Sequence, residues 1–372
     1  MSDIKKTKRQ AISERRLDLP ILSIPRKTQP SLTMGVLTSS VPRLPSITPK
    51  PDARSALLFT DMTSSKRSLF VRGSQSMLTT PAMKQSRKML PGGAIRDFGN
   101  ASQQGGKVRN QDAWILARDV RPGLHMLGIF DGHGPHGHDI SAYLKERFLS
   151  FVQESLVEDS KDALVEGLKS GFKTVSTGVR KAGVDYTYSG STCLAVLLQG
   201  PLCICAHVGD SRAVLGRKTL TDWKTVSIST DHKPDLRDES ARIIGAGGVI
   251  STSCVGSGPS TGPLRVWLRN QRIPGLAMTR SIGDAVAQRV GVISLPDVTE
   301  TALTCEHKIL VVASDGLWTV MASEEVVEQV GKWYDAGTSA GRAAEWLLRE
   351  ALRRWERAGE SDDITLQVVF FE

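Results

Sequence analysis

The chain has 372 residues, of which 40% are hydrophobic and 23% charged, with a formal net charge of +9. This composition is typical of a soluble protein with one large or two small folded domains. No apolar run approaches the about 20 residues that a transmembrane helix requires, which excludes a membrane-spanning protein. The 5 cysteines form no Cys-x-x-Cys pair. That argues against a disulfide scaffold and against a cysteine-rich zinc module.

The positive charge is concentrated at the N-terminus. Residues 1–90 contain 17 Lys and Arg against 5 Asp and Glu, a net charge of +12, whereas the other 282 residues contain 31 against 34, a net charge of −3. The first 90 residues also contain only two aromatic side chains, Phe59 and Phe70. So little apolar surface cannot offset the entropy of ordering a chain. We therefore expect 1–90 to be a disordered basic tail rich in Ser, Thr and Pro, and 91–372 to be the folded domain.

A basic motif in this tail suggests a partner. Two arginines followed by apolar residues at alternating positions resemble the docking peptides read by mitogen-activated protein kinases: Arg15, Arg16, Leu17, Leu19 and Ile21. The alternative is that the basic runs at 5–9 and 15–16 form a nuclear-import signal or a solvated basic surface. The tail has neither stacking aromatic residues nor a recognisable binding fold, which argues against a nucleic-acid partner. We expect the protein in the cytoplasm, the nucleus or both.

The folded part begins with strands and a pair of helices. Taken in chain order, apolar runs predict strands at 113–117, 126–130, 192–198, 202–208, 211–215, 308–313 and 364–371. The turn at 199–201 has hairpin length, so the strands on either side of it should pair antiparallel. Helical periodicity occurs in 139–156, 162–180, 324–334 and 339–357. Ser323 and Thr338 are the expected N-caps of the last two helices. Two early helices, two late helices and strands between them favour α+β layers over a doubly wound parallel sheet.

Aspartates stand where the apolar strands begin or end. Asp131 directly follows the strand at 126–130, Asp315 stands just after 308–313, and Asp362 just before 364–371. Carboxylates that converge from different strands repel one another unless a cation lies between them. Ligands that are all oxygen select hard ions such as Mg²⁺ or Mn²⁺. The alternative for any single aspartate is that it caps a turn.

The segment 131–138 contains two misleading patterns. Its glycines at 132, 134 and 137 spell the dinucleotide-binding fingerprint, but Pro135 removes an N–H that a pyrophosphate would need, and no second strand follows. The histidines at 133, 136 and 138 suggest zinc, but no matching Cys or His set stands elsewhere in the chain. Other phosphate chemistries are excluded because the chain lacks a Cys followed six positions later by Arg, a P-loop and the kinase motifs.

Eight motifs, in this order along the chain, resemble those of the metal-dependent protein phosphatase 2C (PPM) family, and their sequences are most similar to those of its plant and protist members. They are Asn110-Gln-Asp-Ala113, Phe130-Asp-Gly-His-Gly134, Ser189-Gly-Ser-Thr192, Val208-Gly-Asp-Ser-Arg212, Asp231-His-Lys-Pro234, Gly275–Asp284, Ala313-Ser-Asp-Gly-Leu-Trp318 and Asp362-Asp-Ile-Thr365. The resemblance implies two antiparallel β-sheets packed as a sandwich, with α-helices on both outer faces. It also implies a protein serine/threonine phosphatase that hydrolyses phosphoserine and phosphothreonine in phosphoprotein substrates with a metal-activated water.

The resemblance assigns roles position by position. It implies two Mg²⁺ or Mn²⁺ ions held by Asp112, Asp131, the backbone carbonyl of Gly132, Asp315 and Asp362. A weaker third ion would be held by Asp210. His133 matches the residue that protonates the leaving oxygen, a task that suits an imidazole near neutral pH. Lys107 stands where many members have a phosphate-binding Arg; it keeps the charge but loses the bidentate fork.

Two departures from the family pattern affect the metal sites. Gln111 stands where many members have Glu, and Thr319 where many have Asp, which puts the third ion in doubt. The alternative function is a pseudophosphatase that serves as a binding module, but its signature would be the loss of Asp131, Asp315 or Asp362, and the chain retains all three. The physiological substrate would depend on the segment before Gly275, which is rich in Gly, Ser and Pro at 250–264.

Overall fold

The computed structural model describes residues 92–252 and 262–372. The tail at 1–90, which we expect to be disordered, therefore lies outside the described residues, together with the motif that resembles a kinase-docking peptide and most of the segment 250–264. Among the helices of the described part, none is both long and apolar enough to cross a membrane.

The larger sheet has the strand order β12-β4-β3-β5-β6-β13, and β2 pairs with β3. All of these pairings are antiparallel. The turn at 199–201 joins β5 to β6 as predicted, with Gln199 opposite Leu202. The strands are β2 (Asp112–Arg121), β3 (Leu124–His133), β4 (Gly190–Ser191), β5 (Cys193–Gln199), β6 (Leu202–Val208), β12 (Ile282–Gly283) and β13 (Asp297–Ala302).

The second sheet has five strands in the order β1-β15-β14-β7-β8, also antiparallel throughout. Its central strand pair, β14 and β15, is buried almost along its full length because both faces of the sheet are covered. The strands are β1 (Ile95–Gln103), β7 (Arg212–Lys218), β8 (Trp223–Ser227), β14 (His307–Ala313) and β15 (Ile364–Phe371).

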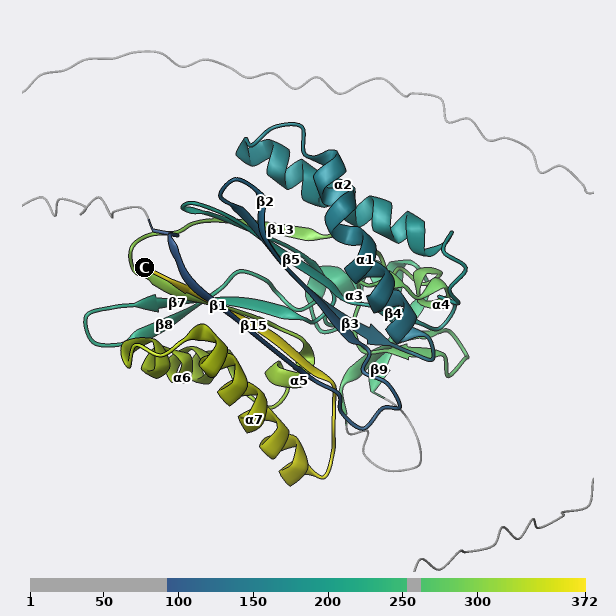
Figure 1. Ribbon diagram of the computed structural model, residues 1–372. Coiled ribbons are helices and arrows are strands. Elements are labelled where there is room, and N and C mark those ends of the chain that lie inside the picture. Colours follow the sequence, from purple (N-terminus) through teal and green to yellow (C-terminus); the bar gives the residue numbers. More distant parts are fainter. Residues whose placement is uncertain (1–91, 253–261) are drawn as a thin grey trace, which may run out of the picture. The chain divides into compact units, whose positions relative to one another are not determined.

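Helices cover the outer faces of both sheets, which gives four layers (Figure 1). The helices α1 (Gly137–Ser155) and α2 (Lys161–Val179) pack on the larger sheet through residues such as Phe148 and Phe172. The five-stranded sheet is covered by α5 (Asp315–Trp318), α6 (Ser323–Asp335) and α7 (Ala340–Ala358). Between the sheets, side chains such as Val196 and Val312 interlock in a core of their own. The α+β sandwich with helices on both outer faces is thereby confirmed.

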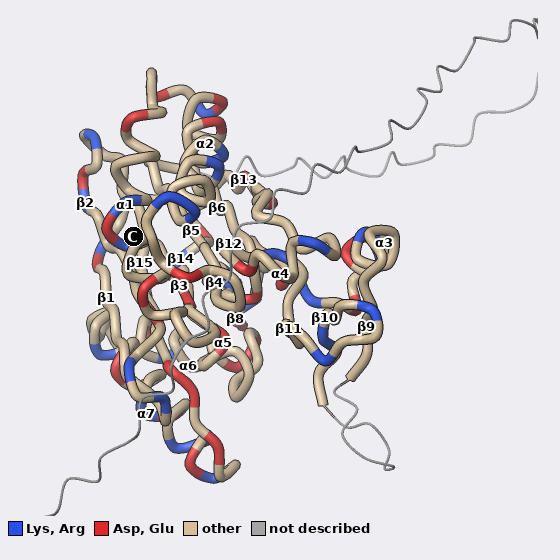
Figure 2. The backbone as a smooth tube through the Cα atoms, turned by 90° about the vertical axis from the view of Figure 1, so that its right-hand side faces the viewer, with Lys and Arg blue, Asp and Glu red and all other residues tan. Residues whose placement is uncertain are grey.

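A small lobe projects from one end of the sandwich (Figure 2). It consists of α3 (Arg237–Gly245), a three-stranded sheet and α4 (Ala285–Gln288), packed around a separate apolar cluster that includes Ile243, Val266 and Val290. The strands of its sheet are β9 (Gly248–Thr252), β10 (Leu264–Leu268) and β11 (Pro274–Leu276).

The two predicted N-caps of the late helices are wrong by one residue. The cap of α6 is Ala322, and Ser323 is the first helical residue; its hydroxyl accepts a hydrogen bond from the Arg212 guanidinium at 2.9 Å. The cap of α7 is Ser339, whose Oγ accepts from the backbone N–H of Arg342. Thr338 instead donates to the carbonyl of Trp333 in the preceding helix. The start of α6 therefore has no side-chain cap, because the Ser323 hydroxyl is engaged by Arg212, whereas α7 is capped by the hydroxyl next to the predicted one.

Candidate active site

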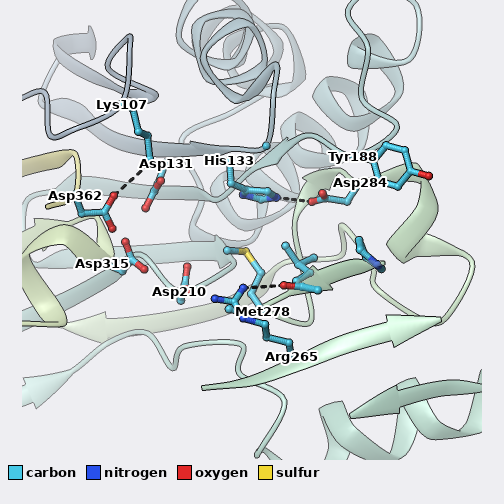
Figure 3. Close-up of a pocket in the computed structure, with 15 residues that line it drawn as sticks. Lys107, Asp131, His133, Tyr188, Asp210, Arg265, Met278, Asp284, Asp315 and Asp362 are labelled. Carbon is cyan, nitrogen blue, oxygen red and sulfur yellow. Dashed lines mark hydrogen bonds and ion pairs between the residues drawn. The ribbon is translucent and has the colours of Figure 1, made fainter. Parts of the chain in front are cut away.

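Five aspartates that stand in or next to strand ends border one open pocket of about 290 Å³ (Figure 3): Asp131, Asp210, Asp284, Asp315 and Asp362. Asp131 stands near the end of β3, and Asp315 opens α5 directly after β14. Asp210 lies in the turn between β6 and β7, and Asp362 lies just before β15. The antiparallel pairing of each sheet brings these ends to the same edge of the sandwich. The convergence expected from the sequence for Asp131, Asp315 and Asp362 is therefore present in the fold.

The environment of these carboxylates disfavours their charged forms. Burial raises the pKa of Asp131 well above its usual range, and the negative charges of Asp112 and Asp315 raise it further. Burial also raises the pKa of Asp315 to about 7, with the charge of Asp210 adding to the effect. Groups buried in this way stay ionised only when a positive charge compensates them.

Asp112 lies behind Asp131, opposite it in the β2–β3 pair. Its Oδ2 accepts a hydrogen bond from the Ser314 hydroxyl at 2.8 Å, and burial raises its pKa to about 6. Gly132, the next residue on β3, approaches Gly137 so closely that an added Cβ would lie 2.3 Å from the Gly137 carbonyl oxygen. A side chain at position 132 would therefore force apart the loop that carries Asp131 and His133.

The donor set fits hard divalent cations. Asp112 Oδ1 and Asp210 Oδ1 are buried and have no hydrogen-bond partner among the described residues. Buried polar atoms are almost always paired, so these two oxygens are available to bind a cation, although the other oxygen of Asp210 accepts from the ammonium of Lys233. The described residues contain no group of three acidic, histidine or cysteine side chains already arranged to hold an ion. The fit thus rests on ligand chemistry and on the unsatisfied oxygens.

Lys107 lies in the loop between β1 and β2, and its side chain extends to the aspartates that border the pocket. Its ammonium lies 3.1 Å from Asp362 Oδ1 and 3.3 Å from Asp363 Oδ2. Although burial opposes it, the charges of Asp362 and Asp131 raise the pKa of Lys107, so the ammonium stays charged. Asp363 also accepts from the backbone N–H groups of Gly105 and Gln111 at 2.8 and 2.9 Å. Sequence reasoning gave Asp363 no role of its own, and the structure shows that it holds the loop that carries Lys107.

His133 lies on the opposite side of Asp131 from Lys107, and its Nε2 is 2.7 Å from Asp284 Oδ2 (Figure 3). Burial lowers the pKa of the imidazole, but the charge and hydrogen bond of Asp284 outweigh burial and raise it. Asp284 stands at the end of the quoted motif Gly275–Asp284, yet sequence reasoning gave it no function. Only the fold reveals the contact, because 151 residues separate the two side chains.

The proposed third-ion residue, Asp210, is already paired. Its Oδ2 accepts from the ammonium of Lys233, which belongs to the Asp231-His-Lys-Pro motif. Thr319, which replaces an aspartate of many family members, is exposed on the surface and does not line the pocket. Lys233 therefore neutralises the carboxylate that a third ion would need.

The two misleading patterns in 131–138 have structural explanations. β3 is flanked by antiparallel β2 and β5, so the glycine-rich loop does not follow a parallel strand as a dinucleotide site requires. His136 and His138 contact Asp139, at 3.2 and 3.3 Å. His133 instead contacts Asp284, so the three histidines do not point to a common centre.

Apolar side chains form the wall of the pocket opposite the aspartates. Tyr188, Pro274, Leu276 and Met278 line it, together with Arg265, which donates to the Gly275 carbonyl at 2.7 Å. Most of this wall belongs to the small lobe that contains β10 and β11 (Figure 2). The pocket is therefore acidic and polar on the sandwich side and mainly apolar on the lobe side.

Comparison with known proteins agrees with this architecture. The sequence profile of the protein phosphatase 2C family matches residues 97–357. Probable protein phosphatase 2C 35 of Arabidopsis thaliana is 34% identical over 279 residues, which cover 70% of this chain and 78% of that protein. Probable protein phosphatase 2C 72 of the same plant is 32% identical over 289 residues, which cover 73% of this chain and 84% of that protein.

Among solved structures, a serine-threonine phosphatase 2C from Toxoplasma gondii superposes with a TM-score of 0.63. The superposition covers 76% of this chain and 98% of the Toxoplasma chain. Because only 22% of the aligned residues are identical, the likeness shows the fold alone. The chain belongs to the protein phosphatase 2C family, the class of metal-dependent protein serine/threonine phosphatases.

Proposed function

We propose that this chain hydrolyses phosphoserine and phosphothreonine in proteins, using water activated by two divalent ions. The observation that carries the proposal is the convergence of five aspartates, a charged lysine and a histidine on one open pocket. Family membership supports the same reaction class.

The ions would be Mg²⁺ or Mn²⁺, since the available donors are carboxylates and a backbone carbonyl. We assign them to a set of residues around Asp131: Asp112, Asp131, the carbonyl of Gly132, Asp315 and Asp362. When bound, such ions supply an activated water and neutralise charge on the phosphoryl group. Because Lys233 pairs with Asp210, we assign no more than a weak site to a third ion.

The remaining polar groups would act on the substrate itself. Lys107 has a charged ammonium at the pocket, so it would bind and orient the phosphate. His133 would give a proton to the serine or threonine oxygen as the bond from that oxygen to phosphorus breaks. The lobe-side wall of Tyr188, Leu276 and Met278 would contact the peptide around the phosphorylated residue.

The test is turnover by the full chain with a phosphothreonine peptide and with p-nitrophenyl phosphate, in the presence of Mn²⁺. We expect phosphate release from both substrates and its loss on addition of EDTA. The competing function is a pseudophosphatase that binds phosphoproteins without hydrolysing them. A folded, Mn²⁺-loaded protein that binds the peptide without turnover would establish that alternative and overturn the proposal.

A further inference from the structure

We infer that Asp284 is the positioning residue for His133. It holds the imidazole with Nε2 as the donor, so that Nδ1 is the nitrogen that serves the leaving oxygen. The inference deepens the proposed function and rests on it, because it assigns the residue that orients the proton donor of that same reaction.

The contact is short and enclosed. His133 Nε2 lies 2.7 Å from Asp284 Oδ2, and the Asp284 side chain is only 3% exposed. The same oxygen accepts from the Ser281 hydroxyl at 2.5 Å, so two donors fix its position. A carboxylate can only accept hydrogen bonds, which requires that the facing ring nitrogen carry the hydrogen.

The other ring nitrogen is left without a partner. His133 Nδ1 is buried and forms no hydrogen bond within the described part of the chain. A buried polar atom without a partner is costly unless a ligand satisfies it. His133 borders the pocket, so a substrate oxygen is the natural partner for Nδ1.

The backbone is arranged around this pair. Asp284 has φ 54° and ψ 53°, the left-handed conformation that residues other than Gly rarely adopt. Its N–H donates to the Ser189 carbonyl at 2.8 Å, which holds the strained residue in place. Gly190 leaves the necessary space, because an added Cβ there would lie 2.1 Å from Asp284 Oδ2 and 2.8 Å from His133 Nε2. Strain that surrounding contacts maintain is typical of functional sites.

The proton balance follows from this geometry. Water oxygen bonds to phosphorus, the bond from phosphorus to the serine or threonine oxygen breaks, and that oxygen takes the proton from His133 Nδ1. His133, which carries a hydrogen on both ring nitrogens before this step, thereby becomes neutral, with the Nε2 hydrogen still donated to Asp284. The proton lost by the water returns to Nδ1 through solvent, so the net reaction consumes one water and releases the alcohol and inorganic phosphate.

The experiment is Asp284→Asn in the full chain with Mn²⁺. Asn has the same size and tolerates the left-handed backbone, so the substitution removes the charge and lets the side chain present an NH₂ group instead. We expect kcat on a phosphothreonine peptide to fall about 10²-fold, the usual size of a general-acid contribution. KM should be unchanged, and p-nitrophenyl phosphate, whose leaving group needs little protonation, should lose only a few-fold. Asp139→Asn is the matched control: Asp139 contacts His136 and His138 at the start of α1, and the variant should keep wild-type rates on both substrates.

Two further variants keep the inference falsifiable. In a His133→Ala background, Asp284→Asn should not lower kcat further, because the imidazole that Asp284 positions is absent. If Asp284→Asn does not fold, Gly190→Ala, which crowds the same pair, should show the same substrate-dependent loss. Equal losses on both substrates, or no loss in a folded variant, would overturn the role of Asp284 while wild-type turnover leaves the proposed function standing. A wild-type chain without metal-dependent turnover would overturn both.

Discussion

The ammonium of Lys107 lies 3.1 Å from Asp362 Oδ1, so the proposed phosphate-binding group contacts a proposed ligand of the metal ions. A second carboxylate, Asp363, holds the same ammonium from the buried side at 3.3 Å. In the proposed reaction, one pair of adjacent aspartates would therefore position the phosphate-binding ammonium and also supply a ligand of the ions.

Lys107→Met should lower kcat/KM on a phosphopeptide about 10- to 100-fold, since a hydrogen bond to a charged group contributes about 1.5–3 kcal/mol. Lys107→Arg should retain most of the activity, because a guanidinium also matches a phosphate. Arg109→Met is the control: Arg109 is exposed two residues further along the loop, outside the pocket that Asp131 borders. Similar losses for Lys107→Met and Arg109→Met would indicate a general electrostatic effect and contradict a specific phosphate contact.

His133→Ala should lower kcat on a phosphopeptide about 10²- to 10⁴-fold, the range of general acid catalysis. The loss on p-nitrophenyl phosphate should be much smaller, because nitrophenolate leaves without a proton. Steady-state kinetics with both substrates at saturating Mn²⁺ measures the difference. If the two substrates lose the same factor, His133 does not act as the acid.

Asp363→Asn should destabilise the fold by about 1–3 kcal/mol, because an amide cannot accept from both backbone N–H groups that now bond to this buried carboxylate. The adjacent Asp362→Asn is the control, since Asp362 is 27% exposed and accepts only from the N–H of Asp363 among backbone groups. Urea unfolding of both variants gives the comparison. An Asp363→Asn chain as stable as Asp362→Asn would show that the loop is held by other contacts.

His232 predicts a pH dependence of stability. Burial, together with the charges of His207 and Arg280, lowers its pKa to about 4. A histidine with a lowered pKa stabilises the fold fully above its unfolded pKa of about 6.5, and this contribution is lost as the pH falls from 6.5 toward 4. Between pH 7.5 and 5 the loss should be about 2 kcal/mol in the free energy of unfolding.

The check is urea unfolding of the wild type and of His232→Asn at both pH values. Asn Oδ1 can replace Nδ1 as the acceptor for the Gly209 N–H, which the structure places 3.1 Å from that ring nitrogen. The variant should lose the His232 share of the pH dependence while the carboxylates titrate as before. Identical pH dependence in the two proteins would show that His232 is not held neutral.

Apolar patterns in the sequence predicted the helices and strands that are most deeply buried in the fold. The four long helices and the central strands β3, β5, β6, β14 and β15 carry strong apolar periodicity, because each packs a face or both faces into a core. The sequence analysis missed the strands β1, β8 and β13. They lie at sheet edges, where most of their residues are exposed or half-buried, so they lack the apolar run that marks a central strand. The small lobe was missed for a similar reason: its strands are short and its core is small.

The candidate site divides in the same way. Asp131, Asp315 and Asp362 were predictable because each stands beside a strong apolar strand, so local sequence marks both the carboxylate and its rigid support. Asp284 and Asp363 were not, because their functions depend on partners 151 and more than 250 residues away in the sequence. Pairing between strands that are distant in the sequence brings the partners together: β3 and β12 both pair with β4, and β1 pairs with β15.

The central claim is that the carboxylates around Asp131 hold the ions that drive hydrolysis. Its most direct test is Asp131→Asn, measured by titration of bound Mn²⁺ and by kcat on a phosphothreonine peptide in the same preparation. We expect Mn²⁺ affinity to fall and turnover to drop at least ~10³-fold, which corresponds to about 4 kcal/mol of barrier, in a protein that unfolds at the wild-type urea concentration or above. Near-wild-type turnover at saturating Mn²⁺ would contradict the account.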